Sequence, residues 1–239
     1  MSTDVALPSV EKHQHHRDVT GGWLRPAVFG AMDGLVSNFA LLSGVVGGGA
    51  SNAIVVMTGL AGLAAGACAM AAGEYTSVTS QAELMRAEID IEKAELQRNP
   101  EGELAELTAL YEARGLDSDT AALVAAQLTE QPELAWRVHV REELGVDPDD
   151  LPSPYVAAIS SFTAFALGAI IPVLPFMLGA TGLLVTGLIS VLGLIALGAA
   201  VARLTARPWW LGATRQLLLG GIAAAATFGI GSLVGVSIS

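Results

Sequence analysis

The sequence contains a single cysteine, Cys68, so no disulfide can form within the chain. It is also poor in charge: 15% of its 239 residues are Asp, Glu, Lys or Arg, against about 25% in soluble domains. Basic residues are outnumbered by acidic ones, and the formal net charge is −11. These shortages exclude a disulfide-stapled scaffold and argue against a nucleic-acid-binding protein, which needs a basic surface.

Signatures of catalysis are also lacking. The chain has no H-E-x-x-H motif, no strained G-x-S-x-G turn and no phosphate-binding loop. An E-x-x-H pair is absent, which counts against a ferritin-like di-iron oxidase. The first 18 residues are polar, so we expect no cleaved signal peptide. We therefore predict that the protein is not an enzyme.

The few charges are distributed unevenly. Residues 81–151 hold 18 of the 23 acidic residues and 6 of the 12 basic ones. The remainder of the chain is strongly apolar, and hydrophobic residues make up 52% of the whole. The sequence thus describes an apolar protein with one acidic insert, and such an insert favours cationic ligands, metal ions above all.

Five apolar segments are long enough to cross a bilayer, which takes about 20 residues. They predict an all-α, polytopic membrane protein, and small residues within them favour close helix packing. We expect Pro172 and Pro175 to break or bend the third segment. The predicted spans are residues 23–49, 52–79, 155–178, 182–201 and 214–236.

The domain organisation follows from these segments. Lys and Arg residues precede the first span and lie between the fourth and fifth, which predicts that the tail and the insert are cytoplasmic. Within the insert we predict four helical segments, at 80–98, 101–114, 118–129 and 132–144, the first continuing the second span without a break. The predicted domains are a tail (1–22), spans one and two (23–79), a helical metal-binding insert (80–151) and spans three to five (152–239).

Two carboxylates lie in or near the predicted membrane segments. Asp33 lies inside the first span, and burying a carboxylate in a membrane is costly, so it is a candidate functional residue. Met70 and Glu74 lie one helical turn apart near the end of the second span. A site that combines carboxylate oxygens with a thioether sulfur suits a borderline divalent ion such as Fe²⁺. The alternative for Asp33 is a structural role, in which it pairs with Asn38 or with a backbone group. Met70 could simply pack in the membrane, and Glu74 could reach the membrane interface.

The first insert helix carries an acidic stripe. Glu88, Glu92 and Glu95 have i, i+4 and i+7 spacing, which places them within about 60° of one another. Spacing alone favours a solvated acidic face over a metal site.

The last insert helix places His139 and Glu143 one turn apart, with Glu142 beside them. A histidine and a carboxylate at this spacing can share a metal ion. The alternative is a surface ion pair with Arg137 or Arg141.

Four motifs in this order resemble the vacuolar iron transporter family. They are "DGLVSNFALLSGVVG" (33–47), "GLAAGACAMAAGEYTSVTSQAE" (62–83), "REELGV" (141–146) and "SSFTAFALGAIIPVLPF" (160–176). The resemblance implies a homodimer with an ion path between the subunits. It also implies that Fe²⁺, and often Mn²⁺, leaves the cytosol in exchange for protons.

The resemblance assigns roles to particular residues. Asp33 and Met70 match path residues of the family, and Glu74 falls in its recurrent G-E-Y turn. Glutamates of the cytoplasmic domain that bind metal in the family are matched by Glu92, Glu95 and Glu143, and a frequent acidic position by Glu88.

The chain also departs from the plant members. Gly62 stands where they carry a glutamate, and His139 and Val140 stand where they carry two methionines. Gln81 and Leu84 replace further ligands, which favours fewer ions in the insert. Histidine in place of methionine hardens the site and favours Mn²⁺, Co²⁺ or Zn²⁺.

These observations predict a proton-coupled transporter of Fe²⁺ and Mn²⁺, with Zn²⁺ and Co²⁺ as alternatives and no prosthetic group. The expected partners are divalent ions, protons, the lipid bilayer and a second copy of the chain, with no nucleic acid. We expect a bacterial plasma membrane, or a vacuolar membrane in a eukaryote. The alternatives are a membrane-tethered metal sensor or buffer without transport, and an intramembrane enzyme, for which no second catalytic group is evident.

Overall fold

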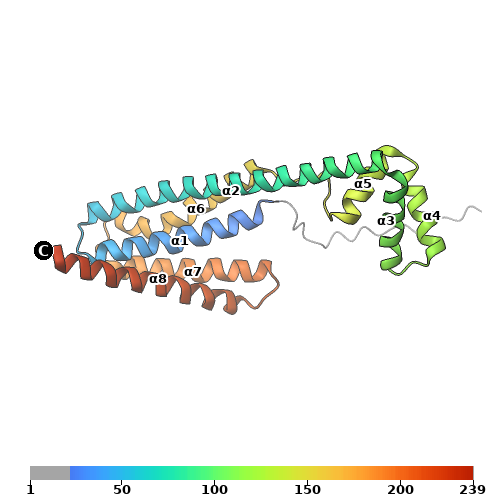
Figure 1. Ribbon diagram of the computed structural model, residues 1–239. Coiled ribbons are helices and arrows are strands. Elements are labelled where there is room, and N and C mark those ends of the chain that lie inside the picture. The colour runs from blue at the N-terminus through green and yellow to red at the C-terminus, as the bar shows by residue number, and fades with distance from the viewer. Residues whose placement is uncertain (1–21, 239) are drawn as a thin grey trace, which may run out of the picture.

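The structure of the protein, a computed structural model, describes residues 22–238. The predicted tail, with its histidines His13, His15 and His16, lies outside the described residues except for Gly22. Every regular element in the described part is a helix, as the sequence predicts (Figure 1). The helices are α1 (Leu24–Gly47), α2 (Asn52–Arg98), α3 (Pro100–Ala113), α4 (Ser118–Thr129), α5 (Pro132–Glu143), α6 (Pro154–Met177), α7 (Leu183–Leu204) and α8 (Trp209–Ile238).

Five of these helices, α1, α2, α6, α7 and α8, are long and apolar enough to cross a membrane. They confirm the predicted fold class of an all-α polytopic membrane protein. Two details differ from the prediction. The fifth span begins at Trp209 rather than 214. Helix α6 stays helical through Pro172 and Pro175, so the expected break does not occur; both prolines lie in the last two turns, where few further intrahelical hydrogen bonds follow them.

Helix α2 joins the two parts of the molecule. It has 47 residues and is therefore about 70 Å long. Its first half lies in the membrane bundle and its second half reaches the insert, where α3, α4 and α5 gather around its end (Figure 1). It ends at Arg98, and the side chain of Asn99 then caps α3 by accepting a hydrogen bond from the Gly102 amide at 3.2 Å. One continuous helix thus fixes the spacing between membrane and insert.

Glycines bring α1 and α6 into backbone contact. A Cβ atom added to Gly34 would lie 2.2 Å from the carbonyl oxygen of Phe165, and one added to Gly168 would lie 2.2 Å from that of Ala31. Membrane helices gain their packing energy from such close approach, since lipid offers no hydrophobic drive for association. Because α6 supports α1 along this seam, the side chains on the neighbouring face of α1 are held against α2.

Candidate metal sites

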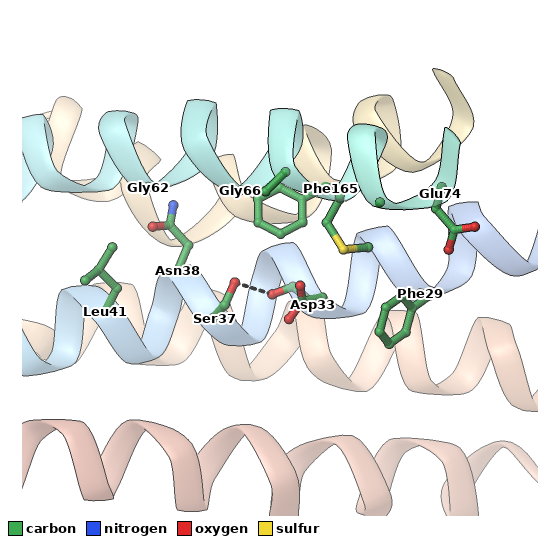
Figure 2. Close-up of a pocket in the computed structure, with 12 residues that line it drawn as sticks. Phe29, Asp33, Ser37, Asn38, Leu41, Gly62, Gly66, Glu74 and Phe165 are labelled. Carbon is green, nitrogen blue, oxygen red and sulfur yellow. Dashed lines mark hydrogen bonds between the residues drawn. The ribbon is translucent and has the colours of Figure 1, made fainter. Parts of the chain in front are cut away.

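A cavity of about 540 Å³ lies between α1 and α2, with Phe165 of α6 in its wall. We call it the membrane cavity; Figure 2 shows its lining side chains. The lining residues are Phe29, Asp33, Ser37, Asn38, Leu41, Gly62, Gly66, Ala69, Met70, Gly73, Glu74 and Phe165. Asp33, Met70 and Glu74, the three candidates that the sequence offers in the membrane, therefore share one cavity.

Asp33 is half-buried in the membrane cavity. Among the described residues no group donates a hydrogen bond to its carboxylate; Ser37 donates to its backbone carbonyl instead, at 2.5 Å (Figure 2). Asn38, the alternative structural partner, bonds to Gly59 and Ala169. The carboxylate is thus available to a ligand in the cavity.

Glu74 marks the end of the membrane cavity nearest the insert. It is buried, and one carboxylate oxygen accepts a hydrogen bond from the Arg25 guanidinium at 2.7 Å. The Arg25 side chain is 71% exposed, so the counter-ion approaches from outside. The cavity extends from Glu74 to Gly62, which is about 18 Å along α2.

Beyond Gly62 the membrane cavity is closed by apolar side chains. Leu42, Val55, Val173 and Phe176 form a buried cluster between α1, α2 and α6. The donors of the cavity therefore lie on the insert side of a hydrophobic barrier.

One wall of the membrane cavity is missing in the single chain. Several lining residues are exposed, among them Phe29 at 55% and the polar Ser37. Ala69 and Gly73 on α2 are exposed as well. The membrane cavity of the single chain is therefore open on the side that carries Phe29, Ser37, Ala69 and Gly73.

A second group of candidate ligands lies in the insert. Glu92 of α2, Glu103 of α3, and His139 and Glu143 of α5 each offer one ligand atom, and these atoms all lie within 4.8 Å of one another. We call these four residues the insert cluster. Nδ1 of His139 lies 2.8 Å from Glu143 Oε1, 3.3 Å from Glu92 Oε1 and 3.7 Å from Glu103 Oε2. Ligand atoms arranged tetrahedrally around one metal ion lie about 3.4 Å from one another. The distances from His139 Nδ1 to the three carboxylate oxygens are close to this value, so the four side chains are placed as the ligands of a single ion would be.

The insert cluster is buried. His139 is 0% exposed, and Glu92 and Glu103 are also buried. Burial raises the pKa of Glu92 to about 7, and the neighbouring negative charges of Glu143 and Glu103 add to this shift. Burial also raises the pKa of Glu143 to about 7, with smaller contributions from the negative charges of Glu106, Glu103 and Glu95. Gathering carboxylates without a cation is thus costly, and a bound divalent ion would remove that cost.

The other predicted insert residues lie elsewhere. The Glu142 carboxylate binds Arg114, accepts a hydrogen bond from Tyr111 at 3.4 Å, and so is held outside the insert cluster. Glu95 is half-buried beside the cluster and pairs with Arg98 at 3.3 Å. Glu88 is exposed. The stripe thus divides into one buried member of the insert cluster, Glu92, one neighbour of the cluster, Glu95, and one solvated residue, Glu88.

Sequence reasoning missed Glu103. It lies in the first turn of α3, where acidic residues are common because they favour the helix N-terminus. One signal was present: Glu103 precedes Leu107 by four residues, and Leu107 is fully buried. A carboxylate on the buried face of a small bundle needs a partner.

The sequence model of the VIT family matches residues 24–232. The chain belongs to the VIT family. The match runs from the first residue of α1 into α8, so it covers both the membrane cavity and the insert cluster. The family consists of transporters, which confirms the prediction that the chain is not an enzyme.

Several curated VIT-family relatives match nearly the whole chain. The vacuolar iron transporter of Acanthamoeba castellanii is 38% identical over 95% of this chain and 84% of its own length. Vacuolar iron transporter 1 of Arabidopsis thaliana is 30% identical over 94% of this chain and 91% of its own. Vacuolar iron transporter 1 of Eucalyptus grandis is 29% identical over 94% of this chain and 92% of its own length.

Proposed function

We propose that this protein is a proton-coupled transporter that moves Fe²⁺, and also Mn²⁺, out of the cytosol across a membrane. The observation that carries the proposal is the membrane cavity, in which Asp33, Met70 and Glu74 lie together between two membrane helices. Membership of the VIT family and relatives named as vacuolar iron transporters support metal-ion transport. A thioether among carboxylates suits a borderline divalent ion.

Asp33 gives proton coupling a physical basis. A carboxylate at membrane depth is costly as a free anion, so it holds either a cation or a proton. An ion that binds must find Asp33 deprotonated, and after the ion leaves, a proton neutralises the carboxylate again. Ion and proton thus alternate at one group, which is the requirement for exchange.

Glu74 and Arg25 form the entrance in this proposal. The guanidinium neutralises Glu74 while no ion is present. An arriving divalent cation displaces Arg25, whose exposed side chain can turn outward, and then moves inward to Met70 and Asp33.

The insert cluster captures ions in this proposal. Its three carboxylates and one imidazole suit Fe²⁺, Mn²⁺, Co²⁺ and Zn²⁺ rather than Ca²⁺. Glu92 and Glu74 lie on the same helix, about 27 Å apart. The acidic insert raises the local concentration of cations near the entrance, provided that it faces the cytosol as the Lys/Arg distribution predicts.

A second copy of the chain supplies the missing wall of the membrane cavity. The exposed cavity side of α1 and α2 carries Ser37 and the half-buried Asp33, which lipid does not cover favourably. A homodimer that joins these faces places the path between the two subunits.

Flux into proteoliposomes tests the proposed function. Purified protein, with a metal-sensitive dye inside, should transport Fe²⁺ and Mn²⁺ only when an opposing pH gradient is present. Asp33→Ala should abolish flux while metal binding by the insert persists. Wild-type flux from Asp33→Ala would overturn the proposed path. Stoichiometric binding by the wild type without flux would instead favour the sensor or buffer.

Cysteine cross-linking tests the dimer. In a Cys68→Ala background, Ala69→Cys on the cavity side should give a disulfide-linked dimer in membranes. Leu192→Cys, which is exposed on α7, serves as the control and should remain monomeric. Equal cross-linking at both positions would contradict this arrangement.

A further inference from the structure

Asn38 of α1 is buried in the membrane cavity wall, with 2% of its surface exposed. Its side-chain amide nitrogen donates two hydrogen bonds, to the carbonyl oxygen of Gly59 on α2 at 3.1 Å and to that of Ala169 on α6 at 2.7 Å. Carbonyl oxygens only accept hydrogen bonds. The amide nitrogen must therefore face α2 and α6, and this fixes the direction of the amide oxygen.

The amide oxygen, Oδ1, is fully shielded yet finds no hydrogen-bond donor among the described residues. Leaving a buried acceptor without a partner costs free energy. Oδ1 lies beside Gly62, because a Cβ atom added to that glycine would be 2.9 Å away from it. Figure 2 shows Asn38 directed toward α2 at the Gly62 end of the membrane cavity.

Oδ1 is shielded in the single chain, but it lies in the cavity wall beside a glycine and near the partly exposed side chain of Leu41, which can turn away. Gly62 and Gly66 line this end of the cavity without side chains. Asn38 is five residues beyond Asp33, or about 7.5 Å deeper along α1. The next side chains inward belong to the apolar barrier of Leu42 and Val55. Oδ1 is thus a polar atom at the inner end of the cavity, before the path closes.

We propose that Asn38 Oδ1 is a ligand for the ion in transit, at a position deeper than Asp33 and Met70. The proposal rests on the proposed function of the membrane cavity as the ion path. The amide oxygen replaces one water of a partly hydrated divalent cation. It is a hard, neutral donor, so it favours Mn²⁺ and Fe²⁺ over soft ions such as Cd²⁺, whereas the Met70 thioether favours the soft ions.

Asn38 also joins three helices, so its replacement can disturb packing. Gly62→Ala reduces this difficulty, since it removes neither the amide of Asn38 nor its two acceptors, Gly59 and Ala169. Its new methyl group would lie 2.9 Å from Oδ1 and 2.7 Å from a methyl group of Leu41, whose side chain is partly exposed and can turn away. Gly187→Ala on α7 is the matched control, because a Cβ atom there meets nothing within 4 Å and Gly187 does not line the membrane cavity.

The test is initial flux of Mn²⁺ and of Cd²⁺ in proteoliposomes of the full chain. Gly62→Ala should raise KM for Mn²⁺ about ten-fold and KM for Cd²⁺ by less than about two-fold, the loss of one hard ligand. Gly187→Ala should leave both values unchanged. Met70→Leu should shift the Mn²⁺/Cd²⁺ ratio in the opposite direction.

Asn38→Leu, kept only if its thermal unfolding in detergent matches the wild type, should reproduce the Gly62→Ala shift. An unchanged KM for Mn²⁺ in Gly62→Ala would overturn the proposal, and so would an equal loss for both ions, which indicates packing alone or a bound water. These outcomes leave the proposed function standing as long as Asp33→Ala abolishes flux. Wild-type flux from Asp33→Ala would overturn both.

Discussion

The insert cluster and the membrane cavity both combine carboxylates with another donor, but they distribute the donors differently. In the insert cluster four ligand atoms lie within 4.8 Å of one another. In the membrane cavity, Glu74, Met70, Asp33 and Asn38 are spread over about 18 Å of helix. A converging set can hold an ion tightly, while conduction needs sites weak enough to release it. The difference favours capture in the insert and passage in the membrane.

The position of α2 explains why the two regions can differ. Its outer half faces α3 and α5, which bring Glu103 and His139 against Glu92. Its inner half faces α1 across an open cavity, with fewer ligands at each level. The same helix therefore carries one member of the closed insert cluster, Glu92, and two donors of the open membrane cavity, Met70 and Glu74.

The largest effect that would separate the two regions comes from Glu103→Gln. Removing one charged ligand should weaken Mn²⁺ binding by the insert by about 100-fold or more, as measured by calorimetry on the full chain in detergent. Flux at saturating Mn²⁺ should remain near the wild-type value. Glu142→Gln is the control, because Glu142 binds Arg114 outside the cluster. If flux fell in parallel with binding, capture and passage would not be separate.

A smaller effect concerns pH. The pKa values of Glu92 and Glu143 are raised to about 7, so at pH 6 an ion must displace protons that are absent at pH 8. Affinity of the insert for Mn²⁺ should rise by up to about ten-fold per pH unit for each proton released, then level off above pH 8.

Folding stability gives a second readout of the same pKa shifts. Since the folded state holds more protons than the unfolded state between pH 4.5 and 7, the metal-free protein should lose stability as pH rises through that window. The gain in Tm on adding Mn²⁺ should accordingly be larger at pH 8 than at pH 6. Equal gains would contradict the assignment of these carboxylates to a metal site.

The smallest expected effect is at the entrance of the membrane cavity. Arg25→Gln removes the guanidinium that competes with cations for Glu74, so KM for Mn²⁺ flux should fall about three-fold, the scale of a largely exposed ion pair. Arg207→Gln, in the loop between α7 and α8, removes the same charge elsewhere and should have no effect. A raised KM in Arg25→Gln would indicate that Arg25 supports the site rather than guarding it.

The candidate residues in the membrane were predictable from the sequence, because a carboxylate buried at membrane depth is costly unless it faces a cavity or a partner. Asp33 and Glu74 are the only acidic residues in the predicted spans, and the structure brings both to the membrane cavity. The sequence suggests Asn38 only as a partner of Asp33. Its actual partners, Gly59 and Ala169, lie on two other helices, and spacing along α1 carries no information about them.

The insert was harder to predict. Glu88, Glu92 and Glu95 have equivalent spacing, yet Glu92 is buried and Glu88 is exposed. A stripe on a helix does not reveal which of its residues the next helices cover. Glu103 was hidden for the same reason, because an acidic residue in a first helical turn already has a local explanation.

The sequence by itself determined the five spans, the helical insert and the membrane candidates, because hydrophobic length and the cost of intramembrane charge are properties of the chain read locally. Tertiary structure alone decided which acidic residues converge and which way Asn38 Oδ1 points. Those outcomes depend on contacts between helices far apart in the sequence: α2 with α3 and α5 in the insert, and α1 with α2 and α6 in the membrane.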